Sequence, residues 1–358
     1  MQKKYILSID AGTTSSRAII FNKNAEIEEI AQYEFNQIFP NEGWVEHDAV
    51  EIWNTQLKAI KDVINKSNID PKNIESIGIT NQRETTVIWN KKTGKPVFNA
   101  IVWQDRRTAS FCDELKKNNK TELIQNKTGL VIDAYFSGTK IKWILDNNPK
   151  IRSQANDGKL LFGTIDTWLI WNLTNGNYHI TDPSNASRTL LYNIKDDKWD
   201  DELLSLFDIP KTILPTVVDS SGISAYVDDN IFGFKIPISG IAGDQQAALF
   251  GQLCTNQGDI KNTYGTGCFC MMNTGKTFVK SNNKMLSTIA WRINGEVSYA
   301  LEGSIFVAGA LIQWLRDKLG IINDASEVEN LANTVDNNGG LTFIPALSGL
   351  AAPYWDPY

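Results

Sequence analysis

Residues 5–21 read Tyr-Ile-Leu-Ser-Ile-Asp-Ala-Gly-Thr-Thr-Ser-Ser-Arg-Ala-Ile-Ile-Phe, and this stretch decides how the sequence is expected to fold. A first apolar run, Tyr5–Ile9, ends at Asp10. A second apolar run, Arg17–Phe21, follows the small residues 11–14. Two short apolar runs on either side of a small-residue turn are typical of a β-hairpin. We therefore predict a hairpin whose first strand ends in a carboxylate.

The predicted turn has the features of a phosphate-binding loop. Gly12 lets the backbone approach a ligand, and the hydroxyls of Thr13, Thr14 and Ser15 lie beside backbone N–H groups, a concave set of donors that suits phosphate. A charge on Asp10 at the end of an apolar strand is costly without a cation or hydrogen-bond donors, and Mg²⁺ near the phosphates would meet that need. An Asx-turn at Asp10 explains the same residues equally well. The stretch lacks the Gly-x-x-x-x-Gly-Lys-Ser/Thr pattern of a Walker loop.

A second copy of the pattern favours the phosphate interpretation. Residues 261–272 read Lys-Asn-Thr-Tyr-Gly-Thr-Gly-Cys-Phe-Cys-Met-Met, again an extended run around a Gly-Thr turn. Two such hairpins in two halves of one chain indicate a duplicated domain that holds a nucleotide between its halves.

Length and composition indicate a globular protein of about two domains. The chain has 358 residues, of which 42% are hydrophobic, enough for a sizeable core. Because the net charge is −6 and the basic residues are scattered, we expect neither nucleic acid nor an anionic membrane as a partner. The sequence shows no apolar run of membrane-spanning length and no signal peptide, and its four cysteines and two histidines lack zinc-site spacing. We infer a reduced, cytoplasmic protein without membrane insertion.

Strand and helix patterns alternate along the chain, which indicates an α/β fold. Asp48 is a plausible N-cap of a long helix. The apolar residues expected on the buried face of that helix are Val50, Trp53, Leu57, Ile60 and Ile64. In the second half, Ser304–Leu319 is predicted to be a helix, with Gly309 in its first turns and Gln313 one turn further on. Gly309 would permit the close approach of a nucleotide.

Four side chains near the ends of predicted strands have both a structural and a functional interpretation. Arg83 and Glu84 either form an ion pair at a sheet edge, which is the commoner arrangement, or bind a polyol, whose hydroxyls both donate and accept hydrogen bonds. Asp244 is either a helix N-cap or a base at the end of a strand, where open α/β sheets place ligands. Trp103 either packs in the core or forms the wall of a site for an apolar carbon chain.

Longer motifs are distributed over nearly the whole chain. They are Asp-x-Gly-Thr-Thr-Ser-Ser-Arg (10–17), Gly-Trp-Val-Glu-His-Asp (43–48), Gly-Ile-Thr-Asn-Gln-Arg-Glu-Thr-Thr (78–86), Tyr-Phe-Ser-Gly-Thr-Lys (135–140), Asp-Thr-Trp-Leu-Ile-Trp (166–171), Asn-Ala-Ser-Arg-Thr (185–189), Ile-Ala-Gly-Asp-Gln-Gln-Ala-Ala-Leu-Phe-Gly-Gln-Leu (241–253) and Asn-Thr-Tyr-Gly-Thr-Gly-Cys-Phe (262–269). With these motifs the sequence resembles the FGGY family of carbohydrate kinases. The Asn-Gln-Arg-Glu-Thr and Gly-Asp-Gln-Gln-Ala segments resemble the members that phosphorylate glycerol.

The resemblance implies a duplicated RNase H-like architecture, the actin/Hsp70/sugar-kinase fold. An N-terminal domain, residues 1–250, would contain the polyol site and the first phosphate hairpin. A C-terminal domain, residues 251–358, would contain the second hairpin and part of the ATP site. Because the family chain continues past Tyr358, we expect an N-terminal portion with an incomplete second domain, whose adenine contacts lie beyond it. We expect the full-length form to be a homo-oligomer.

The resemblance also implies a reaction, the phosphorylation of glycerol to sn-glycerol 3-phosphate by ATP and Mg²⁺ held between two lobes. The glycerol hydroxyls would be bound by Arg83, Glu84, Tyr135, Asp244 and Gln245, with Trp103 and Phe269 beside the carbon chain and Asp244 as general base. The ATP site would consist of Thr13, Thr14, Ser15, Arg17, Thr266, Gly309 and Gln313. Asp10 would lie near Mg²⁺, with water between them.

Two departures from the family pattern and three alternatives accompany this interpretation. Ala11 stands where close relatives carry Gln, and the loop 228–235 lacks the glycine-rich segment through which some bacterial members bind fructose 1,6-bisphosphate, so we do not expect that regulation. The alternatives are a kinase for another polyol or sugar, an inactive truncated product, and a non-catalytic ATP-binding switch of the Hsp70/actin type. The switch would hydrolyse ATP irrespective of glycerol, and it gives no reason for Arg83, Tyr135 and Asp244 together.

Overall fold

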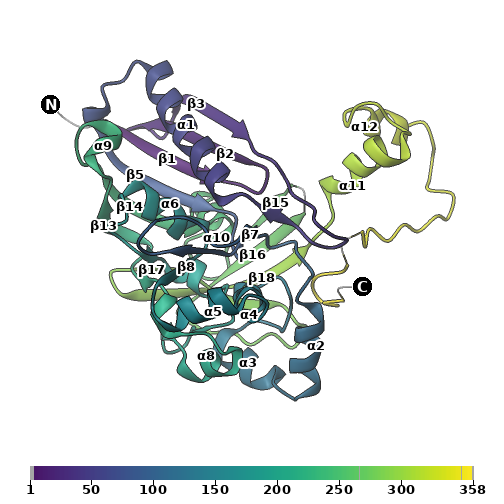
Figure 1. Ribbon diagram of the computed structural model, residues 1–358. Coiled ribbons are helices and arrows are strands. Elements are labelled where there is room, and N and C mark those ends of the chain that lie inside the picture. The colour runs from purple at the N-terminus through teal and green to yellow at the C-terminus, as the bar shows by residue number, and fades with distance from the viewer. Residues whose placement is uncertain (1–3, 266, 348, 357–358) are drawn as a thin grey trace.

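The computed structural model describes residues 4–265, 267–347 and 349–356. Within these ranges ten strands form one mixed sheet in the order β15-β16-β18-β17-β13-β14-β5-β1-β2-β3 (Figure 1). Thr266, which the resemblance assigns to the ATP site, lies outside the described residues. In the part of the chain that is described, no helix combines the length and the apolar character that a membrane crossing requires.

The first part of the sheet is built on the predicted hairpin at residues 5–21, which is confirmed. Its strands are β1 (Tyr5–Ala11), β2 (Ser15–Asn22), β3 (Ile27–Glu34), β5 (Ile74–Asn81), β14 (Pro237–Gly243) and β13 (Ser221–Tyr226). Strands β1, β2 and β3 pair antiparallel, whereas β1, β5 and β14 run parallel to one another. In register, Ala11 and Gly243 both lie beside Asn81. The segments that follow these three strands therefore emerge together at one edge, where ligands bind in open α/β sheets.

The second part of the sheet repeats the antiparallel portion of the first. Its strands are β15 (Ile260–Tyr264), β16 (Cys268–Gly275), β17 (Leu286–Ile293) and β18 (Glu296–Ile305). Tyr264 pairs with Cys268 across the turn, so the second predicted hairpin is confirmed. Strands β15, β16 and β18 are neighbours in the sheet and pair antiparallel, as β1, β2 and β3 do. Strand β17 pairs with β13 and so connects this part of the sheet to the first. One sheet thus runs through both halves of the chain.

Helix α1 (Ala49–Ser67) covers one face of the first part of the sheet, and the N-cap predicted at Asp48 is confirmed, since its carboxylate accepts the Val50 N–H at 2.8 Å. The predicted buried face is partly wrong. Val50 is 42% exposed, and the buried residues are Ala49, Ile52, Gln56, Ala59, Ile60, Val63 and Ile64. The prediction followed the larger apolar residues, whereas the contact with the sheet favours small Ala59 and polar Gln56, whose amide donates to the Arg17 carbonyl.

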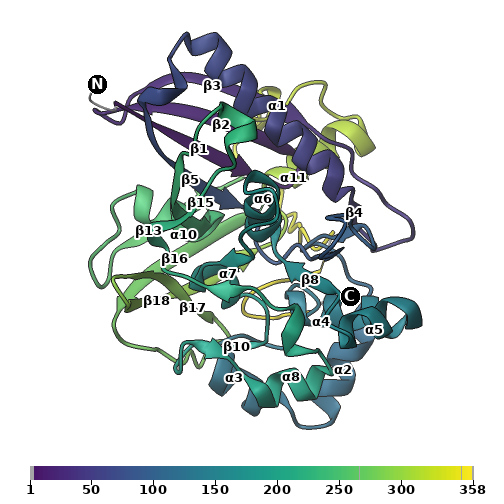
Figure 2. The same cartoon turned by 60° about the vertical axis from the view of Figure 1, so that its left-hand side comes forward.

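Helix α6 (Ile165–Leu173) shares a core with α1, because Trp168 and Leu169 belong to the same cluster of buried residues as Ile52 and Ile60 (Figure 2). Other helices in the described ranges are α2 (Ala109–Lys117), α3 (Thr121–Thr128), α4 (Ser137–Asp146), α5 (Pro149–Asn156), α7 (Pro183–Ala186), α8 (Asp201–Phe207), α9 (Asp229–Phe232) and α10 (Asp244–Gly251). Short strands are β4 (Glu46–His47), β6 (Val87–Asn90), β7 (Ala100–Ile101), β8 (Leu160–Gly163), β9 (Ile180–Thr181), β10 (Tyr192–Asn193), β11 (Lys198–Trp199) and β12 (Thr216–Val217).

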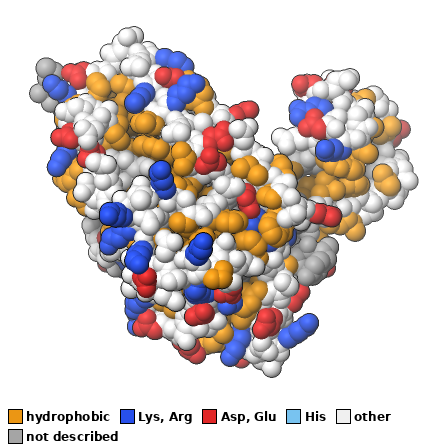
Figure 3. Space-filling view, in the orientation of Figure 1, with side chains coloured by type: hydrophobic (Ala, Val, Ile, Leu, Met, Phe, Trp, Pro, Cys, Tyr) orange, Lys and Arg blue, Asp and Glu red, His pale blue; other side chains and the backbone are white. Residues whose placement is uncertain are grey.

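The helix predicted at Ser304–Leu319 begins later than expected. Ser304 lies in β18, which extends to Ile305 because it pairs with β16, a contact that local sequence cannot report. Helix α11 spans Gly309–Trp314 and continues as a π-helical segment, Leu315–Leu319. Together with α12 (Glu327–Ala332) it forms an arm that projects from the body, with a hollow between body and arm (Figures 1 and 3).

We predict that Ile52→Ala lowers the free energy of unfolding by about 2–5 kcal/mol, because Ile52 is fully buried against the sheet. Val50→Ala, in the same turn of α1, should change it by no more than about 0.5 kcal/mol. Urea-induced unfolding followed by circular dichroism measures both. Equal losses in the two variants would show that α1 buries a different face.

Candidate active site

A cavity of about 170 Å³ opens at the edge where β1, β5 and β14 end. Its lining residues are Thr13, Gln82, Arg83, Glu84, Trp103, Tyr135, Asp244, Gln245, Thr263, Gly265, Gly267 and Phe269. Pockets for drug-sized ligands measure roughly 300–1,000 Å³, so this cavity suits a smaller molecule. The structure therefore brings all seven residues of the predicted polyol site around one cavity, together with Thr13 of the first phosphate turn.

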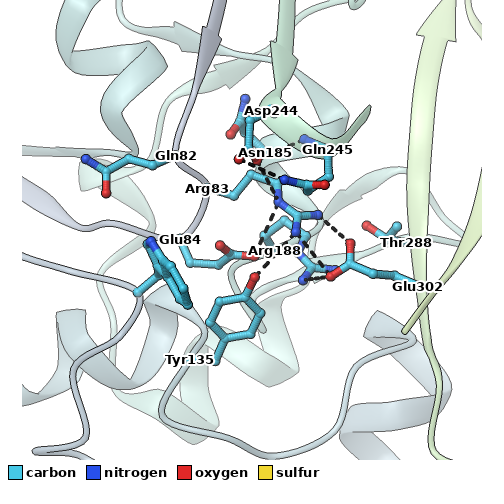
Figure 4. Close-up of polar contacts among 12 residues, drawn as sticks. Gln82, Arg83, Glu84, Tyr135, Asn185, Arg188, Asp244, Gln245, Thr288 and Glu302 are labelled. Carbon is cyan, nitrogen blue, oxygen red and sulfur yellow. Dashed lines mark hydrogen bonds and ion pairs between the residues drawn. The ribbon is translucent and has the colours of Figure 1, made fainter. Parts of the chain in front are cut away.

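Arg83 lies at the base of the cavity, almost completely buried, and is held by several partners (Figure 4). Its guanidinium binds Glu302 on β18 in bidentate fashion, at 2.6 Å from Nη1 and 3.1 Å from Nη2. Nη1 also donates to Gln246 at 3.2 Å, and Nη2 to the Tyr135 hydroxyl at 3.4 Å. Nε lies 3.3 Å from a carboxylate oxygen of Asp244. Arg83 thus connects the second half of the chain to the functional face of the cavity.

The ion pair expected between Arg83 and Glu84 is not the main contact of either residue. The closest charged atoms of their side chains, Nε of Arg83 and Oε1 of Glu84, are 3.9 Å apart, whereas Glu84 accepts from Nε of Arg188 at 2.6 Å. Arg188 also donates to Glu302 at 2.9 Å, so two guanidinium groups and two carboxylates form one buried network. Burial alone would raise the pKa of Glu302, but Arg188 and Arg83 hold that pKa at about 2.

Asp244 is the first residue of α10, and its N-cap is Gly243, so the N-cap interpretation of Asp244 is wrong by one residue. One oxygen, Oδ1, accepts the Gln245 backbone N–H at 2.9 Å. The other, Oδ2, accepts the side-chain amide of Gln245 at 3.0 Å. A Cβ at position 243 would lie 2.7 Å from the Arg83 side chain, so only glycine lets Arg83 pass beneath Asp244. The carboxylate, 40% exposed, faces the cavity.

Aromatic rings form one wall of the cavity. Trp103 meets Tyr135 edge-to-face, with ring centroids 5.7 Å apart, and Phe269 at 6.3 Å. The Trp103 indole N–H donates to the Thr13 hydroxyl at 3.0 Å, which connects this wall to the first phosphate turn. Trp103 is 9% exposed and packs in a core cluster while it also lines the cavity, so its packing role is confirmed and its place beside a carbon chain stays a prediction. Burial raises the pKa of Tyr135, which keeps its hydroxyl neutral and able to donate.

The first phosphate turn has free donors. The backbone N–H groups of Thr13 and Thr14 meet no acceptor within the described residues, whereas Gly12 N–H closes the turn onto Ser15 O at 2.9 Å. Thr14 is exposed, and Ser15 is partly buried. Both Ser15 and Arg17 are oriented by Gln32, which donates to the Ser15 hydroxyl and accepts from Nε of Arg17. This geometry fits an anion at the turn.

Asp10 lies behind that turn, 3.8 Å from Arg17. Burial raises the pKa of Asp10, Arg17 opposes this shift, and the charge of Asp244 adds to it. Asp10 and Asp244 are therefore close enough to influence each other. Mg²⁺ is commonly bound by one or two carboxylates together with substrate phosphates, and a single half-buried carboxylate beside an anion site fits that pattern. The described residues contain no cluster of three or more His, Cys, Asp or Glu that could hold a metal alone.

The second turn and the start of α11 meet beside the cavity. Gly265 and Gly267, which flank position 266, line the cavity, and Gly309 N–H donates to Gly265 O at 2.9 Å. A Cβ on Gly267 would lie 2.5 Å from Ile305 O, so this turn needs a glycine there. Gln313 is exposed on α11 and does not line the cavity. The structure thus brings Gly309, but not Gln313, into contact with the second turn.

His47 is buried in the core and supports the first turn through Gln37. Its Nε2 lies 2.7 Å from Oε1 of Gln37, and the Gln37 amide donates to Thr13 O at 3.1 Å. On its other side, Nδ1 of His47 lies 3.4 Å from the Gln82 amide. This pattern corresponds to a neutral imidazole with its proton on Nε2. Burial lowers the pKa of His47 to about 4.

Comparison with known families decides what kind of protein this site belongs to. The family model for the N-terminal domain of the FGGY family of carbohydrate kinases matches residues 5–251, and the model for the C-terminal domain matches residues 260–358. This chain belongs to the FGGY family of carbohydrate kinases. The resemblance seen in the sequence is confirmed, and the chain is an enzyme of the kinase class.

Individual relatives of this FGGY kinase are closely similar. It is 60% identical over 355 residues to glycerol kinase 2 of Thermotoga maritima, a match that covers 99% of this chain and 72% of the relative. It is also 60% identical to glycerol kinase 1 of Clostridium tetani, covering 99% of this chain and 71% of the relative. The crystal structure of Plasmodium falciparum glycerol kinase with ADP is 38% identical, with a TM-score of 0.89, and the match covers 99% of this chain and 71% of that one. The fold is also shared by a xylulose kinase of Lactobacillus acidophilus, which confirms the predicted sugar-kinase architecture. That structure is 23% identical, with a TM-score of 0.85, and the match covers 99% of this chain and 71% of that one.

Sequence reasoning missed several residues of the site in this FGGY kinase. Arg188, Gln246 and Lys261 occur in quoted stretches without a role, and Glu302 lies in none of them. Glu302 carries one available signal in the sequence, a carboxylate that follows directly on Val-Ser-Tyr-Ala-Leu (297–301), a mainly apolar run. Its two arginine partners lie more than a hundred residues away, so the signal indicates a buried charge but not what neutralises it.

We predict that Glu302→Gln lowers the free energy of unfolding by about 3–5 kcal/mol, because it leaves two buried guanidinium groups facing one carboxylate. The matched control is Glu296→Gln on the same strand, where the ion pair with Lys276 is exposed and its loss should leave stability nearly unchanged. Urea unfolding gives both values. A decrease in the free energy of unfolding as small as that of the control would show that the four buried charges do not depend on one another.

A second prediction concerns pH. Because the pKa of folded His47 is about 4 and that of an unfolded histidine about 6.5, only the unfolded chain takes up a proton as the pH falls below 6.5. This group's stabilisation is complete above pH 6.5 and is lost between pH 6.5 and 4, by up to about 1.4 kcal/mol per pH unit. His47→Gln should remove that part of the slope when unfolding in urea is measured across this range. Parallel slopes for the two proteins would show that His47 is protonated in the folded state.

Proposed function

We propose that this protein transfers the terminal phosphoryl group of ATP to glycerol, giving sn-glycerol 3-phosphate and ADP, with Asp244 as the general base. The observation that carries the proposal is the small cavity in which a carboxylate, a guanidinium and a phenol converge beside aromatic rings. The 60% identity to glycerol kinases of Thermotoga maritima and Clostridium tetani supports the same substrate.

The contacts inside the cavity suit a three-carbon polyol. Each hydroxyl both donates and accepts, and the cavity offers carboxylates on Glu84 and Asp244 with donors on Tyr135 and Gln245. Two long contacts of Arg83, 3.4 Å to Tyr135 and 3.3 Å to Asp244, are ones that a ligand hydroxyl can replace or bridge. The rings of Trp103 and Phe269 would cover the carbon chain.

Asp244 is suited to take the proton of the attacking hydroxyl because its carboxylate is oriented but open to the cavity. The backbone N–H of Gln245 and its side-chain amide fix the two oxygens, and Arg83 compensates the charge from below. Phosphoryl transfer otherwise requires mainly positioning and charge neutralisation. Enclosure of glycerol between the two hairpins would also exclude water from the transfer.

The ATP phosphates would be bound by the two turns, through Thr13, Thr14, Ser15 and Arg17 in the first and Thr266 in the second, with Gly309 and Gln313 completing the site. Asp10 is the residue that would hold Mg²⁺, through water. Bound there, Mg²⁺ would neutralise part of the phosphate charge. A domain boundary at residues 250/251, a cytoplasmic location and a homo-oligomeric full-length form remain part of the same proposal.

We predict that Asp244→Asn lowers glycerol-dependent ADP formation by at least about 100-fold, because the amide cannot accept the proton. Glycerol binding, measured by calorimetry, should be largely retained, since the other polar groups of the cavity stay in place. Asp201→Asn is the control, because that carboxylate is 78% exposed and remote from the cavity.

Two results would count against the proposal in different ways. Undiminished turnover in Asp244→Asn would remove Asp244 from the role of base. If the unmodified protein neither binds glycerol nor forms ADP in its presence, while a panel of other polyols and sugars is phosphorylated, the substrate assignment is wrong.

A further inference from the structure

Lys261 on β15 is a buried cation beside the active site. It is 5% exposed, and its ammonium group has three partners. It donates to Oε1 of Gln245, to the Thr263 hydroxyl at 2.9 Å and to the Phe269 carbonyl at 3.1 Å. An ammonium group has three N–H donors, so every donor of Lys261 is used. The side chain therefore has one defined position and contacts three residues that line the cavity.

The surroundings of Lys261 indicate that its position is maintained at a cost. Burial lowers the pKa of its ammonium group to about 8, with Glu302 and Asp244 opposing this shift and Arg83 adding to it. A lysine that only filled space on β15 could extend to solvent, as long charged side chains commonly do. The buried position is compensated by the three hydrogen bonds, of which one reaches the side chain next to the proposed base.

The contact of Lys261 determines which way the Gln245 amide points. With Oε1 on the ammonium, Nε2 faces Oδ2 of Asp244 at 3.0 Å. In the flipped orientation the NH₂ group would face a cation and the carbonyl oxygen a carboxylate, and both contacts would be repulsive. The charge on Lys261 thus selects one of two amide orientations, and that orientation supplies the donor that fixes Oδ2 of Asp244.

We propose that Lys261 is a positioning residue for phosphoryl transfer: by orienting the Gln245 amide it fixes the Asp244 carboxylate, and by binding the Phe269 carbonyl it links that carboxylate to the second phosphate hairpin. This inference rests on the proposed function and extends it. Lys261 lies in the second half of the chain and Gln245 in the first, so the proposed base is oriented only when both halves are in place. Lys261 does not line the cavity and is not itself assigned to substrate.

The test is Lys261→Met, which keeps most of the length of the side chain and removes its donors. We expect kcat per glycerol-binding site, counted by calorimetry, to fall roughly 10- to 100-fold, the range that corresponds to one lost charge-assisted hydrogen bond. KM for glycerol should change less than threefold, because Arg83 and Tyr135 remain. Lys261→Arg should recover part of kcat, since a guanidinium can still donate to Gln245. Lys276→Met is the control, a 74% exposed lysine in the same half of the chain.

A double-mutant cycle with Gln245→Leu separates positioning from a general loss of structure. If Lys261 acts through Gln245, adding Lys261→Met to Gln245→Leu should lower kcat little further, and the two losses should not add. Additive losses, or an unchanged kcat in Lys261→Met while the unmodified protein is active, would overturn the positioning role and leave the proposed function intact. An unmodified protein that forms no ADP with glycerol would overturn the proposed function and this role with it.

Discussion

A buried network of two guanidinium groups and two carboxylates is the interaction on which the site depends. Arg83 and Arg188 share Glu302, and Arg188 also binds Glu84, with all four side chains excluded from water. None of these charges is tolerable alone in that environment, because removal of one partner leaves an uncompensated buried charge. Glu302 lies on β18 and its partners lie in the first half of the chain, so the network fixes both halves at the base of the cavity.

The geometry above this base follows from the sheet. Because β1, β5 and β14 are parallel and in register, the first phosphate turn, Arg83 and Asp244 emerge side by side although they are far apart in sequence. The second hairpin, β15–β16, closes the cavity from the opposite half. Burial decreases from the network toward the cavity, where the Asp244 carboxylate is 40% exposed. A site for a small polar substrate requires a rigid floor, here the buried charge network, and hydrogen-bond acceptors that remain accessible from the cavity.

Two buried side chains that do not line the cavity position groups that do. Neutral His47 acts through Gln37 on the carbonyl of Thr13, and Lys261 acts through Gln245 on Asp244. Burial lowers the pKa of both groups, to about 4 for His47 and about 8 for Lys261, so near pH 7 the imidazole is neutral whereas the lysine keeps its charge. The phosphate turn and the proposed base are thus held by separate hydrogen-bond chains, one in each half of the site.

The sequence by itself determined the α/β class, both hairpins, the N-cap of α1 and seven candidate site residues that share one cavity, because small-residue turns, apolar periodicity and motif spacing are local properties of the chain. Only the tertiary structure decided which charges are partners: Glu302 lies 219 positions from Arg83, and no local pattern reports a pairing that depends on how strands from two halves meet. The same reason explains why the buried face of α1 and the start of α11 differ from the prediction. Each is set by a strand that packs or pairs against it from elsewhere in the chain.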